Sequence, residues 1–424
     1  MSESQAVESP LWKARFFTIW GGQSFSLLGS ALVRFALIWW VTDVTGSALS
    51  LATATLVSVL PMIVLGPFAG TLVDRWKRRW VMVVADGAIA LFTAVLAVLF
   101  WRDAAEMWHV YAILGLRAVG TMFHDPAMTA STSLMVPHEQ LTRIAGFNQT
   151  RWSITEITGA PLGALLVMVL PMQGVLAIDV LTALIAIVPL LFIDVPQPDV
   201  QPVAQSGEKR SLFGDTVAGV RYLWGWRGMF TMVTSISLIQ FFARPATSLA
   251  PLLIRDHFGG GAMEIGWGLV AFHAGSLVGG LLMSTWGGFS SRVKTIWVGL
   301  LGFGLLNLVR GLAPGNAFWL YLVATLISGP AISMAGASYR AILQSTVPPE
   351  MQGRILSVNT SIRTAMGPLG LLLLAPVADR TGVPLMFILR GAAFLFVGVL
   401  WCCLPSVRKV EDGPPAQKPP LHSE

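Results

Sequence analysis

The stretch VPHEQLTRI at residues 136–144 returns as VPPEMQGRI at residues 347–355, 211 positions later in a chain of 424 residues. The identical pairs are Val136/Val347, Pro137/Pro348, Glu139/Glu350, Arg143/Arg354 and Ile144/Ile355, and the register continues to Asn148/Asn359. A repeat of half the chain length inside an apolar sequence predicts two similar membrane halves. Such halves are typical of secondary transporters, which bind their substrate where the repeats meet.

The composition also indicates a membrane protein. Hydrophobic residues make up 54% of the chain and charged residues only 12%, against about 25% charged residues in soluble domains. The mean hydropathy is +0.68. Cys402 and Cys403 are adjacent, a spacing that fits disulfide geometry poorly, so no disulfide framework is expected.

We expect an all-α, polytopic protein with twelve transmembrane helices in two pseudo-symmetric six-helix halves, because a span needs about 20 apolar residues. The predicted spans are 15–41, 48–73, 80–101, 108–135, 143–170, 173–193, 229–254, 264–287, 295–313, 317–343, 353–377 and 384–404.

The pattern of polar segments predicts the domain organisation. Residues 1–193 form the first half, 229–404 the second half, and 194–228 a cytoplasmic linker that ends in an amphipathic helix. Residues 405–424 are expected to be a disordered tail. Most lysines and arginines fall in loops that would share one side with the termini, which predicts a cytoplasmic-membrane protein with both termini in the cytoplasm.

The loop after the second span carries the most specific short motif, GTLVDRWKRR at residues 70–79. It resembles the signature of the major facilitator superfamily, in which a glycine is followed by an acid and a basic cluster. The glycine permits close helix approach, and the charged groups can bind helix ends or carboxylates. By this resemblance a cytoplasmic gate motif consists of Gly70, Asp74, Arg75, Arg78 and Arg79. A second glycine of the family pattern is replaced by Lys77.

Two further stretches are similar to motifs of that superfamily. Arg117 in RAVG resembles its intramembrane arginine motif, and GAPLG at residues 159–163 resembles its antiporter-type glycine–proline motif. The second half answers with GPLG at residues 367–370. The resemblance assigns this motif to Gly159, Pro161, Gly163, Gly367, Pro368 and Gly370, although generic packing of small residues is the alternative interpretation.

Within the superfamily, three sequence segments resemble those of the drug:proton antiporter branch, which includes macrolide efflux proteins and enterobactin exporters. They are GQSFSLLGS at residues 22–30, TDVTGSA at residues 42–48 and FHDPAM at residues 123–128. The resemblance covers nearly the whole chain, and it implies export rather than a particular substrate.

Ionisable residues inside spans are the candidates for proton coupling, because a charge in the membrane is costly. Glu156 lies roughly 20 Å into its span at 1.5 Å per residue and is our first choice; Asp125 is the second. Arg34 or Arg117 would alter the affinity of the carboxylate for protons. A static buried ion pair is the alternative. Asp86 and Asp179 are interpreted as structural.

The substrate is expected at the membrane midplane, in a cavity lined by aromatic and amide side chains. The candidates are Gln23, Trp39, Phe123, Asn148, Trp152, Phe241 and Asn359. The sequence contains no nucleotide-binding loop, no metal-ligand spacing and no local catalytic motif, so we expect neither an enzyme nor a cofactor or metal.

Together these features predict a secondary active transporter that exports a hydrophobic or amphipathic small molecule by alternating access, in exchange for protons. The expected partners are the substrate, protons and the lipid bilayer, with no nucleic acid, and we expect a monomer. The alternatives are a siderophore or lipid exporter, a proton-coupled uptake symporter, and a receptor or scramblase that keeps the fold without transport.

Overall fold

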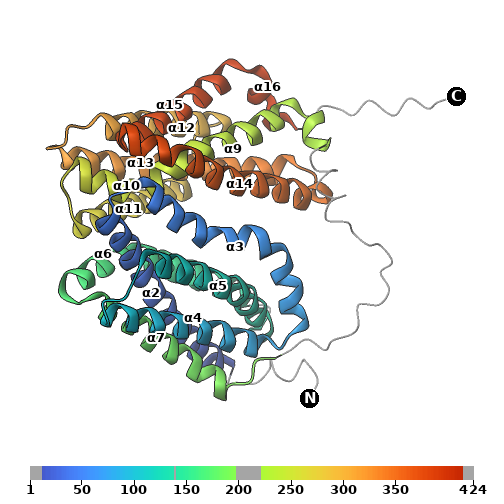
Figure 1. Ribbon diagram of the computed structural model, residues 1–424. Coiled ribbons are helices and arrows are strands. Elements are labelled where there is room, and N and C mark those ends of the chain that lie inside the picture. The colour runs from blue at the N-terminus through green and yellow to red at the C-terminus, as the bar shows by residue number, and fades with distance from the viewer. Residues whose placement is uncertain (1–11, 138–139, 197–220, 414–424) are drawn as a thin grey trace. The chain divides into compact units, whose positions relative to one another are not determined.

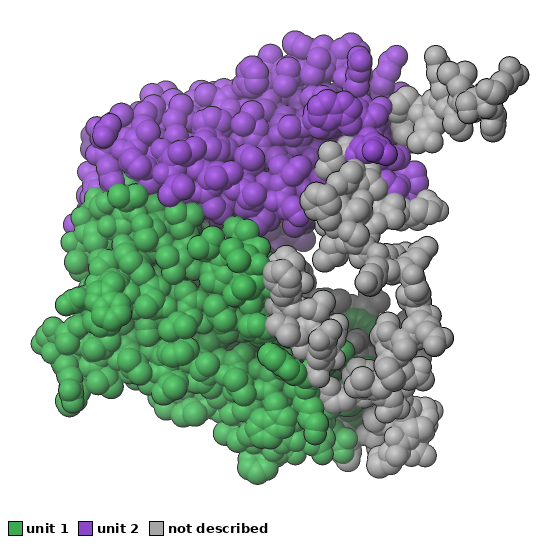
Figure 2. Space-filling view, turned by 45° about the vertical axis from the view of Figure 1, so that its right-hand side comes forward, with its two compact units in different colours: residues 1–206, 260–270 green, residues 207–259, 271–424 purple. Residues whose placement is uncertain are grey.

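The computed structural model describes residues 12–137, 140–196 and 221–413, and no strand occurs in these ranges. The chain divides into two compact units, residues 1–206 with 260–270 and residues 207–259 with 271–424 (Figure 2). Each unit is a layered bundle of long helices (Figure 1).

Unit 1 holds six long helices, which the apolar runs of the first half predict. They are α2 (Trp12–Thr45), α3 (Ala48–Arg75), α4 (Arg78–Trp101), α5 (Met107–Met135), α6 (Leu141–Val169) and α7 (Met172–Phe192). Within the unit, α2 packs on α6 and α7, while α4 packs on α5 and α7. One apolar core of this unit contains Phe16, Met82, Ala127 and Leu190, which come from four different helices.

Unit 2 repeats this order of long helices. They are α9 (Arg227–Ser248), α11 (Ala262–Trp286, whose first residues group with unit 1), α12 (Arg292–Leu312), α13 (Phe318–Thr346), α14 (Pro349–Thr381) and α15 (Pro384–Cys403). A short α10 (Ala250–Leu252) and a π-helical turn, η2 (Leu253–His257), extend α9 with a bend of 45°. The packing follows unit 1, because α12 contacts α13 and α15, and α9 contacts α14 and α15.

The helices of both units are long and apolar enough for a membrane protein. Ten described helices meet the length and composition of a span, and α9 with its bent extension makes an eleventh. Helix α5 is the remaining long helix, and the polar residues Arg117, His124 and Asp125 reduce its apolar character. The twelve predicted spans are therefore consistent with the twelve long helices of the described ranges. Not all twelve helices are as apolar as a typical membrane span.

The segment after the last long helix differs from the expectation of a disordered tail. Pro405–Arg408 form α16 and Lys409–Asp412 a 3₁₀ turn, η3. Val407 and Val410 are fully buried in the core of unit 2 together with Met229 and Trp401. Burial of these side chains orders the segment as far as the description extends, which is residue 413.

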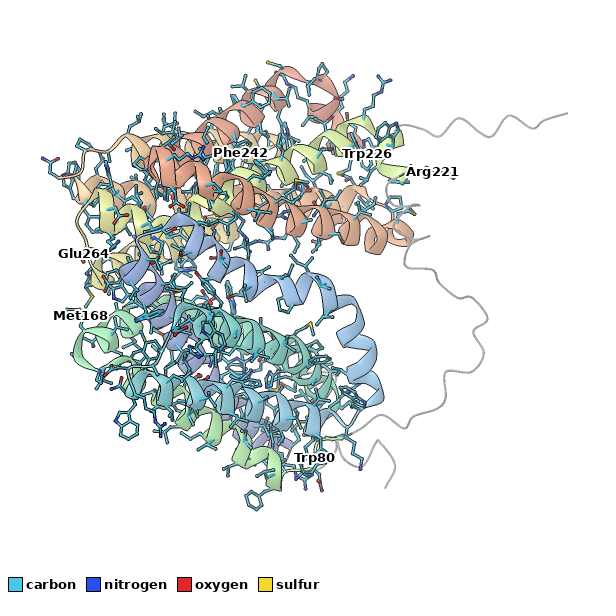
Figure 3. The ribbon with its side chains drawn as sticks, in the orientation of Figure 1. Trp80, Met168, Arg221, Trp226, Phe242 and Glu264 are labelled. Carbon is cyan, nitrogen blue, oxygen red and sulfur yellow. The ribbon has the colours of Figure 1, made fainter. Side chains whose placement is uncertain are left out.

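The start of unit 2 is also packed rather than free. Of the predicted amphipathic linker helix only residues from 221 onward are described. There Leu223 and Trp226 are buried in the core of unit 2, whereas Trp224 is exposed. Figure 3 labels Arg221 and Trp226 at this end of α9. Of the apolar face expected on a membrane surface, Leu223 is therefore covered by protein and Trp224 is not.

Candidate functional site

A buried ion pair links α5 to α7 in the interior of unit 1. Arg117 donates to the carboxylate of Asp179, whose side chain is 1% exposed. Thr93 and Ser30 complete the cluster: the hydroxyl of Ser30 donates to Asp179 Oδ1 at 3.2 Å, and Arg117 Nη2 donates to Ser30 Oγ at 3.0 Å. Four helices are thereby joined by one satisfied network, which stabilises the bundle.

A second polar cluster connects α2, α4 and α5. Asp86, 5% exposed, accepts a hydrogen bond from Gln23 Nε2 at 2.8 Å. His124 lies between two carboxylates, with Nε2 at 3.5 Å from Asp86 Oδ1 and Nδ1 at 3.6 Å from Asp125 Oδ1. The Asp125 side chain is 71% exposed. An imidazole that separates a buried acid from an exposed one can relay a proton between them.

A third charged contact joins α2 to α6. Arg34 Nη2 donates to Glu156 Oε1 at 2.8 Å, and the two side chains are 62% and 25% exposed. The sequence left open whether Arg34 or Arg117 acts on the carboxylate of Glu156, and the structure pairs Arg34 with it. Arg117, the other arginine considered as a partner for the carrier carboxylate, contacts Asp179 instead.

The glycine–proline stretch of α6 lies against α2, next to this contact. A Cβ added to Gly159 would lie 2.9 Å from Ala31 Cβ, and one added to Gly163 would lie 3.0 Å from Phe35 Cβ. The two glycines therefore set how closely α6 approaches α2. Pro161 lies between them inside the helix.

The corresponding stretch of α14 lies against α9 in the same way. A Cβ on Gly367 would lie 2.6 Å from Arg244 Cγ, and one on Gly370 would collide with the carbonyl oxygen of Phe241. Pro368 lies between them inside α14. In each unit the motif packs a late helix against the first helix.

The predicted gate motif is described only in its second part. Gly70, Asp74 and Arg75 lie in α3, but their side chains are outside the described residues. Arg79 donates to the carbonyl oxygens of Leu190 and Leu191 at the end of α7 and to Asp194 Oδ1 at 2.5 Å. Arg78 Nη1 donates to Ala130 O of α5 at 2.8 Å. Within unit 1 these arginines tie α4 to the C-terminal parts of two helices, where a positive charge is favourable.

The cavity candidates of unit 1 are dispersed. Asn148 accepts a hydrogen bond from Trp20 Nε1 at 2.8 Å, and Gln23 is buried on Asp86. Phe123 lies 6.3 Å from Trp76 between ring centroids. Trp152 is exposed and Trp39 is half-buried.

In unit 2, Asn359 is buried and accepts a hydrogen bond from the Tyr339 hydroxyl at 2.8 Å. Phe241 packs edge-on against Phe242, which Figure 3 labels on α9, with ring centroids 5.1 Å apart. The repeat-related Asn148 and Asn359 thus each accept from an aromatic side chain of their own unit. Whether the candidates of either unit contact a substrate stays a prediction.

Sequence reasoning left two members of the polar cluster out of the candidate site, Asp86 and His124. The signal that could have found them is the pair His124–Asp125 on a helix that also carries Arg117. Its meaning depends on the packing of α4 against α5, which brings Asp86 to the imidazole. Among the described residues no group of three or more His, Cys, Asp or Glu side chains could hold a metal ion.

A bundle of long apolar helices repeated in two units, with arginine-rich helix starts and a glycine–proline helix in each, is the architecture of a major facilitator superfamily transporter. The chain belongs to the family described as transmembrane secretion effector, which it matches over residues 5–422. It is a multi-pass membrane protein.

Curated relatives match between 77% and 94% of the chain. Macrolide efflux protein A of Streptococcus pyogenes is 34% identical over 400 residues, covering 94% of this chain and 98% of that protein. Macrolide efflux protein A of Enterococcus faecalis is 33% identical over 326 residues, covering 77% and 100%. The multidrug efflux pump Tap of Mycolicibacterium fortuitum is 26% identical over 396 residues, covering 90% and 94%.

Solved structures show the same fold at low identity. A bacterial homologue of the human lysosomal transporter Spinster, inward-facing and unoccupied, has a TM-score of 0.69 at 13% identity, covering 96% of this chain and 98% of that one. A bacterial homologue of the iron transporter ferroportin, also inward-facing, has a TM-score of 0.69 at 15% identity, covering 94% and 100%.

Proposed function

We propose that this protein exports bulky amphipathic compounds of the macrolide type across the cytoplasmic membrane in exchange for protons. The relatives that cover at least 90% of its length support this direction and substrate class, since they are a macrolide efflux protein and a multidrug efflux pump. The two units would alternate access to a site that faces first the cytoplasm and then the outside. Both termini would lie in the cytoplasm, and the working form would be a monomer.

The observation that carries the coupling proposal is the Arg34–Glu156 pair. Glu156 lies near the middle of α6 (Leu141–Val169), roughly 22 Å from its first residue at 1.5 Å per residue. The carboxylate of Glu156 forms an ion pair with Arg34, and a proton bound to it would remove that pair. Its side chain is 25% exposed, so a proton can reach it, unlike the enclosed carboxylate of Asp179.

In the proposed transport cycle, the carboxylate of Glu156 exchanges Arg34 for a proton. Proton binding to Glu156 would release Arg34 from the one ion pair that joins α2 and α6 within the described residues. Because α6 lies on α2 through Gly159 and Gly163, loss of the ion pair would loosen the contact between these helices. Substrate release on one side and proton release on the other would then be linked to the same helix pair.

The cluster of His124, Asp86 and Asp125 is a second route for the proton. Its exposed end is Asp125 and its buried end Asp86, and Arg151 and Asp179 also act electrostatically on the cluster. Because Gln23 holds Asp86 in place, protonation there would affect α2 as well. This route would lead to the same helix that carries Arg34.

Energised inverted membrane vesicles test the proposal. A pH gradient is imposed, and a panel of macrolides, dyes and catecholate siderophores is added to vesicles with wild-type protein and to vesicles without it. The expected result is proton efflux and compound uptake evoked by macrolides. A response to siderophores alone would favour a siderophore exporter, and no response from well-folded protein would contradict drug–proton exchange.

A further inference from the structure

Two arginines are buried together in unit 2, and no carboxylate of the described residues pairs with them. Arg310 lies in the last turn of α12 and Arg390 in the first two turns of α15, and each residue is 4% exposed. No Asp or Glu within the described residues lies within 4.0 Å of either guanidinium. A buried charge is ordinarily paired or bound to an ion, because its desolvation is costly. The group that balances the charge of these two cations therefore has to be identified.

The hydrogen bonds that the protein supplies are neutral and incomplete. Arg310 Nη2 donates to Ser328 Oγ at 3.3 Å, and Arg390 Nη1 donates to Thr247 Oγ1 at 3.0 Å. Nε of Arg310 and both Nε and Nη2 of Arg390 are enclosed and have no acceptor among the described atoms. Three N–H-bearing nitrogens of two cations are thus buried and unsatisfied, which native proteins generally avoid.

Aromatic rings compensate part of this charge, but the two cations share them. The Arg310 guanidinium lies 5.6 Å from the Phe303 centroid and 5.7 Å from the Phe387 centroid; for Arg390 these distances are 5.6 and 4.7 Å. A ring face attracts a cation, yet two cations near the same rings also repel each other. The rings hold the guanidiniums together without neutralising them.

A comparison of the two repeats shows how the buried charges of unit 2 differ from those of unit 1. The 211-residue shift that relates Val136 to Val347 also relates Arg117 to Ser328 in α5 and α13, and it relates Asp179 to Arg390 in α7 and α15, although the glycine–proline stretch in between is offset by 207 residues. In unit 1 the first members of these pairs form the buried ion pair between α5 and α7. In unit 2 the position of Asp179 is occupied by Arg390, and the position of Arg117 is occupied by Ser328. The helix packing is retained, and the negative charge at the centre of the cluster is lost.

We propose that Arg310 and Arg390 bind a small inorganic anion, chloride being the abundant example, in place of the carboxylate that unit 1 supplies. The free N–H groups are enclosed, so the ion must be small enough to be surrounded, which excludes a lipid headgroup or a bulky substrate. The first turns of α15 favour a negative charge and the last turn of α12 a positive one. The anion would connect α12 and α15, and through Ser328 and Thr247 also α13 and α9.

Thermal unfolding of the purified full-length protein at constant ionic strength tests the site. Chloride, bromide and nitrate are titrated against gluconate, which is too large to be enclosed. The expected result is a saturable rise of the melting temperature, roughly 5 °C at about 100-fold excess over the dissociation constant. Equal melting temperatures in all four anions would overturn the proposal.

Three variants locate the effect. Arg390→Gln should remove the anion dependence, whereas Arg340→Gln, an exposed arginine of the same unit, should keep it. Arg390→Glu restores a carboxylate beside Arg310 and should be stable in gluconate without chloride. If Arg390→Gln does not fold, line broadening of ³⁵Cl in the presence of wild-type protein, reversed by bromide, decides the question. An anion effect that persists in Arg390→Glu would mean that the ion binds elsewhere, and the assignment would fail.

Discussion

Asp179 and Arg390 stand 211 positions apart, at the same place of the two repeats, and carry opposite charges inside their respective units. Asp179 is held by Arg117, while Arg390 lies beside a second arginine, Arg310, on a shared pair of phenylalanine rings. The two repeats therefore pack their helices in the same way, but they differ in the group that balances the buried charge. At this place unit 1 supplies the counter-charge from its own chain, and in unit 2 the proposed anion would supply it.

Glu156→Gln should abolish macrolide-evoked proton movement in energised vesicles. The amide cannot exchange a proton, whereas the loss of a partly exposed ion pair costs only about 0–1 kcal/mol of stability. Protein amount and melting temperature should therefore stay near wild type. Glu264→Gln is the matched control, because Glu264 accepts a hydrogen bond from the backbone N–H of Gly261 at the start of α11 and takes no part in the coupling proposal (Figure 3). Full coupled export by Glu156→Gln would contradict the assignment to Glu156, and Asp125 and His124 would become the candidates for the proton carrier.

Asp179→Asn should destabilise unit 1 by about 3–5 kcal/mol, because the Arg117 guanidinium would remain buried without its counter-charge. The measurement is thermal unfolding in detergent. The double variant Asp179→Leu with Arg117→Leu should recover much of this loss, since it removes both charges from the interior. A double variant as unstable as the single one would show that the hydroxyls of Thr93 and Ser30, rather than the charge, dominate the cluster.

Gly370→Ala should lower stability far more than Gly163→Ala. The new methyl group at residue 370 meets the backbone oxygen of Phe241, which cannot move away, whereas at residue 163 it meets the side chain of Phe35. Gly336→Ala is the control, since nothing lies within 4 Å of a Cβ there. Its effect should be neutral or stabilising by up to about 1 kcal/mol, the difference in helix propensity. Comparable losses at residues 370 and 336 would contradict the packing argument.

Glu411→Ala should destabilise the start of α12 by about 1–2 kcal/mol. The carboxylate accepts hydrogen bonds from Val293 N at 2.6 Å and Ser291 Oγ at 2.8 Å, so it caps the helix from the segment after α15. The neighbouring Asp412→Ala serves as the comparison, because its side chain is exposed. The check is amide hydrogen exchange in the first turn of α12, which should speed up in Glu411→Ala only.

The positions of the long helices were predictable because they depend on local properties of the chain. Apolar length marks a span, and proline, glycine and charge mark its ends, so the predicted 384–404 and the observed Pro384–Cys403 nearly coincide. For the opposite reason, the ordered start of the tail, residues 405–413, was not predicted. Val407 and Val410 look like residues of a short polar segment until the core that receives them is known.

The partners of the charged residues could not be predicted in this way. The sequence by itself determined that this is a repeated bundle of membrane helices with acids and arginines at depth, because hydrophobic length and repeat register are written along the chain. Only the tertiary structure decided that Arg117 meets Asp179, that Arg34 rather than Arg117 meets Glu156, and that Arg390 meets no acid among the described residues. The physical reason is that an ion pair between helices depends on which faces meet and at what height, and helix packing sets both.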